Sequence, residues 1–317
     1  MVLLLRLSLI DQIWFLLAVC FFLACCLHCH TYPSGKFERF RLYQLFQDII
    51  RYGKTKKRLQ RPDFLRIFDI PKRWFFHFYT ISVIWNSLLI FTSLRALILG
   101  ESFPAWLDHM LTLLRGSLGD LQKALSLSVV LVQVLLWIHS LRRLLECLFL
   151  SVFSDGVIHL AQYCFGLGYY VLLGLTALCV DHLHSGDGSL TAQHSFWLQW
   201  YHGPGVLLFL WASFHQHKCL VILARLRTSR SGKDAAQRHA VPHGDWFELV
   251  SCPHYLAELL IYVSFGVCSG DGALTWWLVV LYVLCNQALA ARLSHEFYCS
   301  KFATYPKHRK ALIPYLF

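Results

Sequence analysis

Seven apolar runs, each long enough to cross a lipid bilayer, divide this 317-residue sequence. A transmembrane helix needs about 20 apolar residues to cross roughly 30 Å of hydrocarbon, and it satisfies its own backbone hydrogen bonds there. The chain is 56% hydrophobic and 15% charged, which is unusual for a soluble domain. The runs cover about residues 7–29, 75–99, 121–150, 156–180, 196–224, 246–268 and 273–297. We therefore predict an all-α integral membrane protein: one domain over 1–317 with about seven transmembrane helices and a C-terminal tail over 298–317.

Basic residues gather in three segments that this arrangement places on one side of the membrane. Residues 31–73 carry twelve Lys and Arg, residues 225–245 carry five, and residues 299–317 carry four. The segments 100–120 and 181–195 hold one basic residue between them, beside several carboxylates. Because Lys and Arg concentrate in cytosolic loops, we predict a multi-pass protein with a cytosolic C-terminus. The basic segments are juxtamembrane and form no nucleic-acid-binding motif, so neither a nucleic acid nor an obligate protein partner is expected.

The first run has two features that need interpretation. Arg6 precedes it as in a signal peptide, but no small-x-small cleavage pattern follows the run, which favours an uncleaved anchor. Cys26-x-x-Cys29 with its flanking histidines resembles half of a zinc site. No matching pair lies nearby in sequence, so we predict no metal site.

Polar residues inside the apolar runs indicate a water-accessible cavity that opens toward the basic side. In the third run, Glu146 lies one helical turn beyond both Arg142 and Arg143, so it can pair with either. This group is either an internal ion pair or a clamp for phosphate or carboxylate. Further polar residues are His215, Gln216, His217, Lys218, Glu258, Asn286, Gln287, Arg292 and His295. No dinucleotide-binding glycine motif or P-loop occurs, so a nucleotide would have to bind within the helix bundle.

Several motifs resemble those of a known membrane enzyme family. The C-terminal stretch from Phe297-Tyr298 through Tyr305-Pro306-Lys307 to the final Phe is similar to the ending of the steroid 5α-reductases. The stretch 241–258, with Val241-Pro242-x-Gly244 and Tyr255-Leu256-x-Glu258, resembles their second motif. The segments 51–56, 68–73 and 141–144 resemble the branch of the family that acts on polyprenoids.

The resemblance implies seven helices that enclose NADPH and substrate. It also implies a reductase of the endoplasmic reticulum membrane that saturates the α-isoprene double bond of polyprenal, giving dolichal for dolichol synthesis and protein N-glycosylation. Reduction of 3-oxo-Δ4 steroids is within the range of the family. The only partner it implies is the polyprenoid lipid substrate in the membrane.

The family's catalytic residues fall on four positions of this sequence. Gln47-Asp48 corresponds to the pair whose carboxyl group helps to bind the substrate carbonyl, and His139-Ser140 corresponds to a His-Tyr pair whose phenol polarises it. Ser is a far weaker acid than Tyr, so either another donor serves here or a water molecule bridges. Cofactor-binding roles carry over to Arg143, Arg225, Arg227, Gly244, His254, Glu258, His295 and Tyr298.

Reaction chemistry favours an aldehyde over an alcohol as the immediate substrate. Hydride adds to a carbon–carbon double bond when a conjugated carbonyl accepts the negative charge and donors stabilise the resulting enolate. An allylic alcohol offers no such acceptor, so polyprenal is the expected substrate. Two alternatives are kept. Cys252-Pro253-His254-Tyr255 also resembles a motif of membrane isoprenylcysteine methyltransferases, and a non-enzymatic lipid-binding protein would share the same composition.

Overall fold

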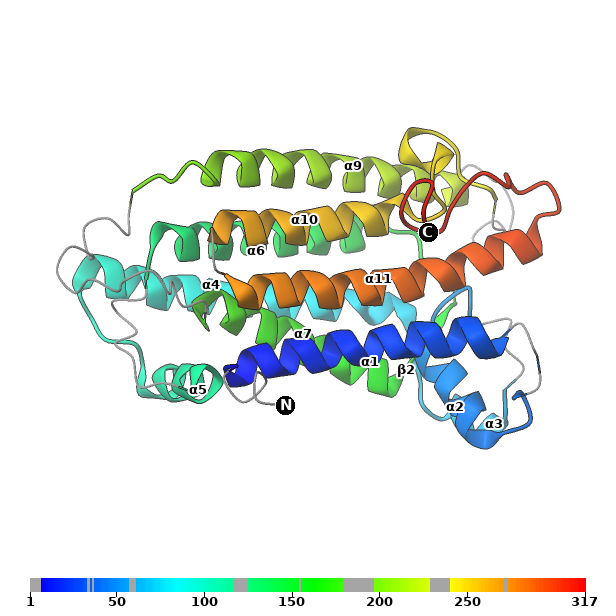
Figure 1. Ribbon diagram of the computed structural model, residues 1–317, viewed down its shortest axis with the longest axis horizontal. Helices are drawn as coiled ribbons and strands as arrows, with labels where there is room; N and C mark the ends of the chain where they lie inside the picture. Colours follow the sequence, from blue (N-terminus) through cyan, green and yellow to red (C-terminus); the bar gives the residue numbers. More distant parts are fainter. Residues whose placement is uncertain are drawn as a thin grey trace.

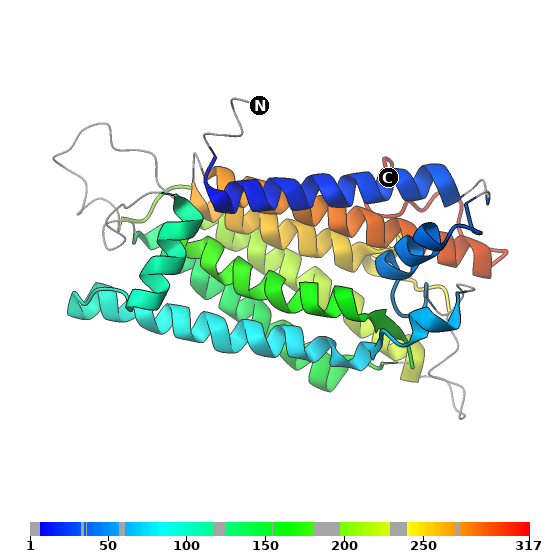
Figure 2. The same cartoon turned by 90° about the horizontal axis from the view of Figure 1, so that it is seen from below.

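The computed structural model is a bundle of long helices that lie side by side, with short segments at both ends (Figures 1 and 2). It describes residues 7–32, 35, 37–56, 61–116, 125–153, 155–179, 197–228, 240–270 and 273–317. The long helices are α1 (Leu9–Thr31), α4 (Phe76–Leu99), α6 (Leu127–Leu145), α7 (Leu160–Cys179), α9 (His202–Thr228), α10 (Pro253–Ser269) and α11 (Leu274–Lys301).

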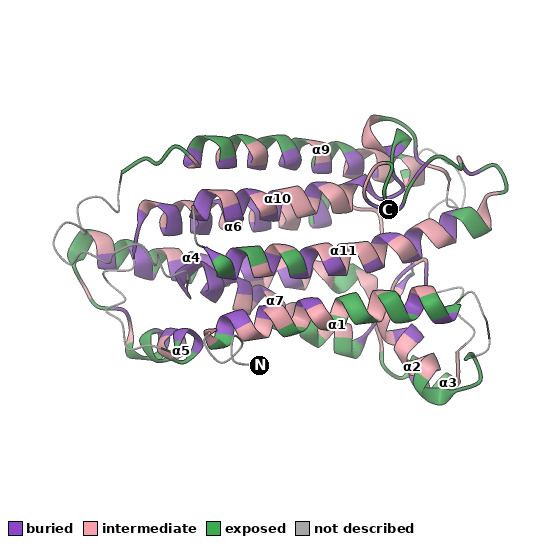
Figure 3. Cartoon of the chain, in the orientation of Figure 1, coloured by how far each residue is buried: buried purple, intermediate pink, exposed green. Residues whose placement is uncertain are grey.

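Among the residues that the structure describes, six helical stretches are long and apolar enough to cross a membrane, by length and composition. They are Leu9–Thr31, Lys72–Leu99, Leu127–Leu150, Leu160–Cys179, His202–Thr228 and Leu274–Lys301. The seventh helix of the bundle, α10, has 17 residues and is about 25 Å long, and it packs against α9, α11 and α6. Exposed apolar side chains such as Leu16, Ile84 and Leu207 cover outward faces of α1, α4 and α9, where lipid would contact them (Figure 3). The chain is a multi-pass, all-α membrane protein, as predicted.

Several helix boundaries differ from those predicted. The expected helix over 246–268 begins instead at Pro253, and the residues before it form the short 3-10 helix η7 (Asp245–Glu248). Pro253 occupies the first turn of α10, where a missing backbone N–H costs nothing, so it starts the helix and does not kink it. The helix α9 begins at His202 and runs on to Thr228.

Polar contacts between helices fix the end of the bundle that lies away from the basic segments. Buried Asp11, in the first turn of α1, accepts a hydrogen bond of 2.6 Å from Thr275 at the start of α11. The Trp14 indole donates to Thr176 of α7 at 3.0 Å. Helices α9 and α10 approach so closely that a Cβ on Gly205 would lie 2.3 Å from the Cys268 sulfur. These contacts fix how far each helix is shifted along its neighbours.

Short elements cover the opposite end of the bundle. They are α2 (Arg41–Ile50), α3 (Asp63–Arg66), η3 (Lys72–Phe75), the π-helical turn η5 (Glu146–Leu150), and the strands β1 (Asp69–Pro71) and β2 (Val157–His159). The strands pair antiparallel, with Ile70 opposite Ile158. α2 is a short amphipathic helix after the first span, and it contains Gln47 and Asp48. At the other end lies α5 (Ala105–Arg115).

The described parts of the three basic segments lie together at one end (Figure 1). This is the arrangement that the predicted spans imply, because an even number of crossings separates each basic segment from the next. Residues 229–239 of the second basic segment and 180–196 of the second acidic loop lie outside the described residues, as do Lys57 and Arg58.

The C-terminal tail folds back onto the segment that precedes α10. Arg309 is 2% exposed and donates to the Pro242 carbonyl and to the Glu248 carboxylate, each at 2.8 Å. Ser251 donates its backbone N–H to the Lys310 carbonyl at 2.8 Å. A buried arginine needs such partners to balance its charge, so these contacts hold the tail in a defined position.

Candidate active site

A cavity of about 420 Å³ opens between the helices near the end of the bundle that carries the basic segments. Its volume lies within the range of about 300–1,000 Å³ that is usual for ligand pockets. Aromatic residues form much of its wall: Phe21, Phe75, Phe78, Phe165, Tyr169, Tyr170, Tyr262 and Tyr282. The wall is drawn from α1, α4, α6, α7, α9, α10 and α11 and from the loop that contains Tyr52.

Positive charge dominates the polar part of the wall. Lys54, Lys72, Arg143 and Arg227 line the cavity, whereas Glu258 is the sole carboxylate among its lining residues. The Lys54 ammonium lies 3.8 Å from the ring centre of Tyr298, so it approaches from the side of the tail. Such a surplus of cations in a partly apolar cavity suits a ligand that carries several negative charges.

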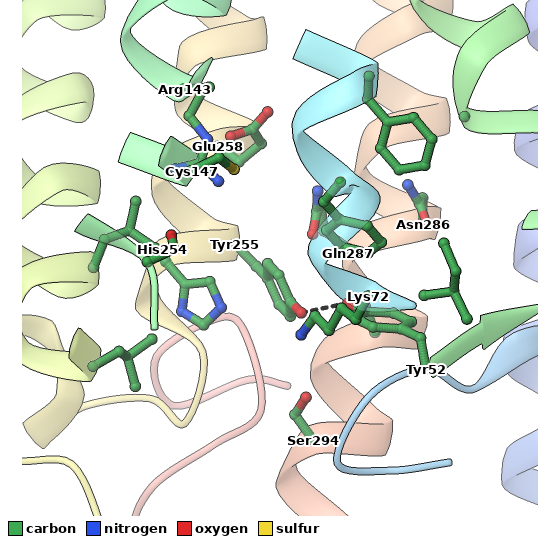
Figure 4. A pocket seen from close by; sticks show the side chains of 18 of the residues that line it. Tyr52, Lys72, Arg143, Cys147, His254, Tyr255, Glu258, Asn286, Gln287 and Ser294 are labelled. Atoms are coloured by element: carbon green, nitrogen blue, oxygen red, sulfur yellow. Dashed lines mark hydrogen bonds between the residues drawn. The ribbon is translucent and has the colours of Figure 1, made fainter. Parts of the chain in front are cut away.

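One face of α10 presents polar side chains to the cavity. His254, Tyr255, Glu258 and Tyr262 all line it, and Figure 4 shows the first three pointing inward. The positions 254, 258 and 262 recur every four residues, which places them on one stripe of the helix. Polar residues in an otherwise apolar helix would be costly against lipid, and the bundle interior accommodates them.

A network of charged groups fixes Glu258 and Arg143. Arg142 and Arg143 both pair with Glu146, at 2.9 and 2.6 Å, so both sequence-predicted pairs form. Arg142 also donates to the Gln216 side-chain oxygen at 2.5 Å, and the Gln216 amide donates to Glu258. These contacts join α6, α9 and α10 and hold the Glu258 carboxylate in place.

His139 supports Glu258 from behind. Its Nε2 lies 3.2 Å from a Glu258 oxygen, and its Nδ1 lies 3.2 Å from the Arg142 guanidinium, which can only donate. His139 therefore accepts at Nδ1 and donates from Nε2. It is fully buried and is not among the cavity-lining residues.

Two tyrosine hydroxyls meet in the cavity at the side nearest the loop. Tyr52, from the loop after α2, and Tyr255 of α10 lie 2.5 Å apart, oxygen to oxygen (Figure 4). The Lys72 ammonium lies 5.3 Å from the Tyr52 ring centre. Burial raises the pKa of Tyr52 to about 12, although the hydrogen bond with Tyr255 partly offsets this effect. The Tyr52 hydroxyl thus keeps its proton at neutral pH.

The structure brings five of the eight predicted cofactor residues to the cavity. Arg143, Arg227, His254, Glu258 and Tyr298 line it. The other three, Arg225, Gly244 and His295, do not line it.

Arg225 lies two positions before Arg227 on α9, which turns it away, and it is exposed. Gly244, with φ of 90°, precedes η7 and donates its N–H to Glu248 at 2.7 Å. His295 lies 2.7 Å from the Ser251 hydroxyl, in the tail contact.

None of the four predicted catalytic residues lines the cavity. Ser140 lies 2.7 Å from the Ser82 hydroxyl and donates to the Leu136 carbonyl at 2.8 Å, in the contact between α6 and α4. Gln47 accepts a hydrogen bond of 3.0 Å from Arg51, and its amide lies 3.3 Å from a His28 ring nitrogen. Their catalytic roles, like that of His139, stay predictions that rest on the resemblance.

Asp48 belongs to a compact ion cluster beneath the loop. It pairs with Lys56 at 2.8 Å and with Arg61 at 3.0 Å, and its side chain is fully buried. Asp69 shares Arg61 at 2.5 Å. Burial opposes ionisation of Asp69, but the Arg61 hydrogen bond and the Lys56 charge outweigh it and lower its pKa. The cluster clamps both ends of the segment 49–56, which carries Tyr52 and Lys54.

Sequence reasoning assigned no role to several residues that line the cavity. Tyr52, Lys54 and Lys72 lie in the motifs that carried the family resemblance, but no role was attached to them. Tyr255 lies beside His254 in the second motif. The motifs that contain these residues could be recognised in the sequence. The contact between the loop that carries Tyr52 and the helix α10 could not.

Comparisons with known proteins identify the family of this chain. A family model described as 3-oxo-5-alpha-steroid 4-dehydrogenase matches residues 158–317, which include α7, α9, α10, α11 and the tail. The chain is 53% identical to the polyprenal reductase of Danio rerio over 310 residues, covering 98% of each chain. It is 54% identical to that of Xenopus tropicalis (98% of this chain, 100% of the relative) and 52% identical to that of Homo sapiens (86% of each). The chain belongs to the 3-oxo-5-alpha-steroid 4-dehydrogenase family, the steroid 5α-reductases.

Proposed function

We propose that this protein reduces the α-isoprene double bond of polyprenal to give dolichal, with NADPH as the reductant. It is an oxidoreductase that acts on carbon–carbon double bonds, and its product leads to dolichol for protein N-glycosylation. The observation that carries the proposal is a cationic, aromatic cavity built around Glu258 and Arg143, in a chain about half identical to polyprenal reductases over nearly its full length.

The residues of the cavity fit NADPH. Among the described residues, the buried Arg143 Nε and His254 Nδ1 have no hydrogen-bond partner, although both residues line the cavity. Buried polar atoms without partners are uncommon and indicate a ligand that would supply them. Lys54 and Arg227 would hold phosphate groups, and Arg143, His254 and Glu258 would hold the polar edge of the nicotinamide end. When bound, NADPH supplies a hydride.

The apolar part of the wall suits the isoprenoid. Phe21 of α1, Phe165 of α7 and Tyr282 of α11 line the cavity, and the Phe21 ring centre lies 5.9 Å from that of Phe165 and 5.4 Å from that of Tyr282. Phe165 is 38% exposed, so this wall reaches the outer surface of the bundle. A polyprenoid tail would leave the cavity here and remain in the membrane.

Three residues outside the lining would act by positioning others. Asp48 holds the segment 49–56 in place through Lys56 and Arg61. His139 would keep the Glu258 carboxylate ionised and oriented through its 3.2 Å contact. His295 would secure the tail through Ser251. The basic end of the bundle would face the cytosol from the endoplasmic reticulum membrane, which places the C-terminus in the cytosol.

Purified protein in nanodiscs, supplied with NADPH and either polyprenal or polyprenol, tests the proposal. We expect oxidation of NADPH and formation of dolichal with polyprenal alone. Turnover of polyprenol in the absence of aldehyde would overturn the substrate assignment. Protection of the protein against unfolding by S-adenosylmethionine, with none by NADPH, would instead identify a methyltransferase.

A matched pair of variants locates the cofactor. Glu258→Gln keeps the side-chain shape but removes the charge, and hydrogen bonds to charged groups contribute about 1.5–3 kcal/mol. We therefore expect NADPH to bind about 10- to 100-fold more weakly. Glu101→Gln changes a half-exposed carboxylate that pairs with Arg95 in the connection between α4 and α5, and it should leave binding unchanged. Equal binding by both variants would exclude Glu258 from the cofactor site.

A further inference from the structure

We propose that the hydroxyls of Tyr52 and Tyr255 form the hydrogen-bond donor that polarises the aldehyde oxygen of the substrate, in place of the phenol that the third span lacks at Ser140. This inference rests on the proposed reduction of polyprenal and identifies the group that activates it. The donor is built from a loop and a helix that lie far apart in sequence.

The Ser140 hydroxyl already makes hydrogen bonds within the helix bundle, so it cannot replace the missing phenol in this structure. Its hydroxyl donates to the Leu136 carbonyl and contacts Ser82, and the residue has no exposed surface. A hydroxyl has a single proton to donate, so Ser140 has none left for a substrate. The cavity nevertheless needs a donor, because negative charge develops on the aldehyde oxygen when hydride adds to C3.

The tyrosine pair has a proton to spare. When two hydroxyls share one hydrogen bond, one of them donates and the other keeps its own proton free. Tyr52 and Tyr255 share a contact of 2.5 Å, and neither hydroxyl has another partner within the described part of the chain. The hydroxyl that accepts is polarised by its neighbour and becomes a better donor to a third group. That third group would be the aldehyde oxygen.

A positive charge lies beside the pair. The Lys72 ammonium is 5.3 Å from the Tyr52 ring centre and 5.6 Å from that of Phe75, and Figure 4 shows it next to the Tyr52–Tyr255 contact. Lys72 lines the cavity and makes no salt bridge with any described carboxylate. In its protonated form this side chain would stabilise the enolate and the phenol that faces it.

Other tyrosines in the cavity are less suited. The Tyr79 hydroxyl already accepts a hydrogen bond of 3.3 Å from Arg143. Tyr169 donates to Tyr262 at 2.7 Å, and these residues form a second pair. The His139 ring centre lies 6.3 Å from that of Tyr262, and no lysine or arginine is recorded over either ring of that pair within the described residues. Compared with the pair formed by Tyr169 and Tyr262, the pair formed by Tyr52 and Tyr255 has a lysine side chain beside it.

The proposed step is balanced. Saturation places a hydride on C3 of the enal, and the π electrons move to the aldehyde oxygen as an enolate. The hydroxyl of the Tyr52–Tyr255 pair whose proton is free donates a hydrogen bond to that oxygen. The enolate collapses when a proton from water adds to C2, and both tyrosine hydroxyls keep their own protons. The aldehyde is retained, so the product is dolichal.

Tyrosine-to-phenylalanine variants test the assignment in the full-length protein. Removing one oxyanion donor typically lowers kcat by about 100- to 1,000-fold. We expect Tyr52→Phe and Tyr255→Phe each to lose about 100-fold in kcat, with NADPH affinity changed less than twofold. Because the two hydroxyls act as a unit, the double variant should be no worse than the slower single variant. Reaction in D2O should place deuterium at C2 of dolichal.

Two further variants separate the possible outcomes. Tyr163→Phe removes a hydroxyl that lies 2.8 Å from the His77 ring, outside the cavity lining, and should keep full activity. Tyr262→Phe tests the second tyrosine pair, and a larger loss there than in Tyr255→Phe would overturn the assignment. Retention of kcat in the Tyr52→Phe/Tyr255→Phe double variant would also overturn it. Failure of the unaltered protein to reduce polyprenal would refute the proposed function itself, which is a separate result.

Discussion

Replacement of Asp48 by Asn should loosen the loop that carries Tyr52 and Lys54 to the cavity. The Asp48 carboxylate contacts the Lys56 ammonium at 2.8 Å and the Arg61 guanidinium at 3.0 Å, with no exposed side-chain surface. Asn keeps the size of the side chain but removes its negative charge. Lys56, itself fully buried, would then depend on Asp69, which lies 3.4 Å away.

The structure sets the size of the effect. Breaking a buried ion pair by removing one partner costs about 3–5 kcal/mol. Asp69 still contacts Arg61 at 2.5 Å and compensates in part, so we expect the low end, about 3 kcal/mol. Since 1.4 kcal/mol corresponds to a factor of ten, the loop should open about 100-fold more often.

Hydrogen exchange over residues 51–56, followed by mass spectrometry, measures this opening directly. The Gly53 N–H donates to the Val157 carbonyl at 2.8 Å and should lose about 100-fold in protection. NADPH affinity and turnover should fall together, because Lys54 and Tyr52 share the loop. Asp63→Asn is the control. Its side chain is 91% exposed and pairs with Arg66 at 3.3 Å, so exchange and turnover should not change.

The opposite pattern would refute this reasoning. If Asp48→Asn lowers turnover but leaves both loop exchange and NADPH affinity unchanged, the carboxylate meets the substrate directly. That result would restore the role that the family resemblance implies for Asp48 and would remove its role as a clamp.

Three other predictions follow from the packing and charges described above. Arg227→Ala should weaken NADPH binding by about 10-fold or more, whereas Arg225→Ala should not, because only Arg227 lines the cavity; equal titrations would contradict the site. Gly205→Val should destabilise the bundle by about 1–3 kcal/mol in thermal unfolding, because a Cβ meets the Cys268 sulfur at 2.3 Å, whereas Gly203→Ala, with nothing within 4 Å, should be neutral. The Gly244 N–H hydrogen bond, helped by Arg309 and opposed by slight burial, lowers the pKa of Glu248. Its contribution to tail docking is thus present above the ordinary Glu pKa and lost as pH falls through the lowered value, so limited proteolysis should release the tail in acid. Glu248→Gln should abolish that pH dependence.

The sequence was sufficient to predict the helix bundle, the end of it that carries the basic segments, and part of the lining of the cavity. Apolar length and the distribution of basic residues predicted the helices and the end at which they carry charge. Arg143 and Glu258 could be expected to face a cavity because a charged residue in an apolar run is costly elsewhere, whereas His254 was predicted from the family resemblance. The helix α10 was predicted to start too early, because Trp246 and Phe247 are apolar although they belong to η7.

The remaining parts depended on contacts that no local pattern encodes. Arg225 and Arg227 are two positions apart on α9, so they point to different sides of the helix. The orientation of α9 in the bundle decides that Arg227 is the one that faces the cavity. Asp48 resembled a substrate-binding carboxylate, and only the folded loop shows that Lys56 and Arg61 surround it. The position of Tyr52 depends on that loop, so its contact with Tyr255 could not be predicted.

The contact between Tyr52 and Tyr255 also has a consequence for how the protein is made. The two residues are 203 positions apart, and ribosomes add roughly 5–20 residues per second. The loop therefore emerges about 10–40 s before its partner on α10 exists. During that interval the ion cluster of Asp48, Lys56, Arg61 and Asp69 can already assemble, because all four lie within one short stretch of chain. The loop that carries Tyr52 can thus take its local structure before α10 and α11 are made, and those helices then complete the cavity.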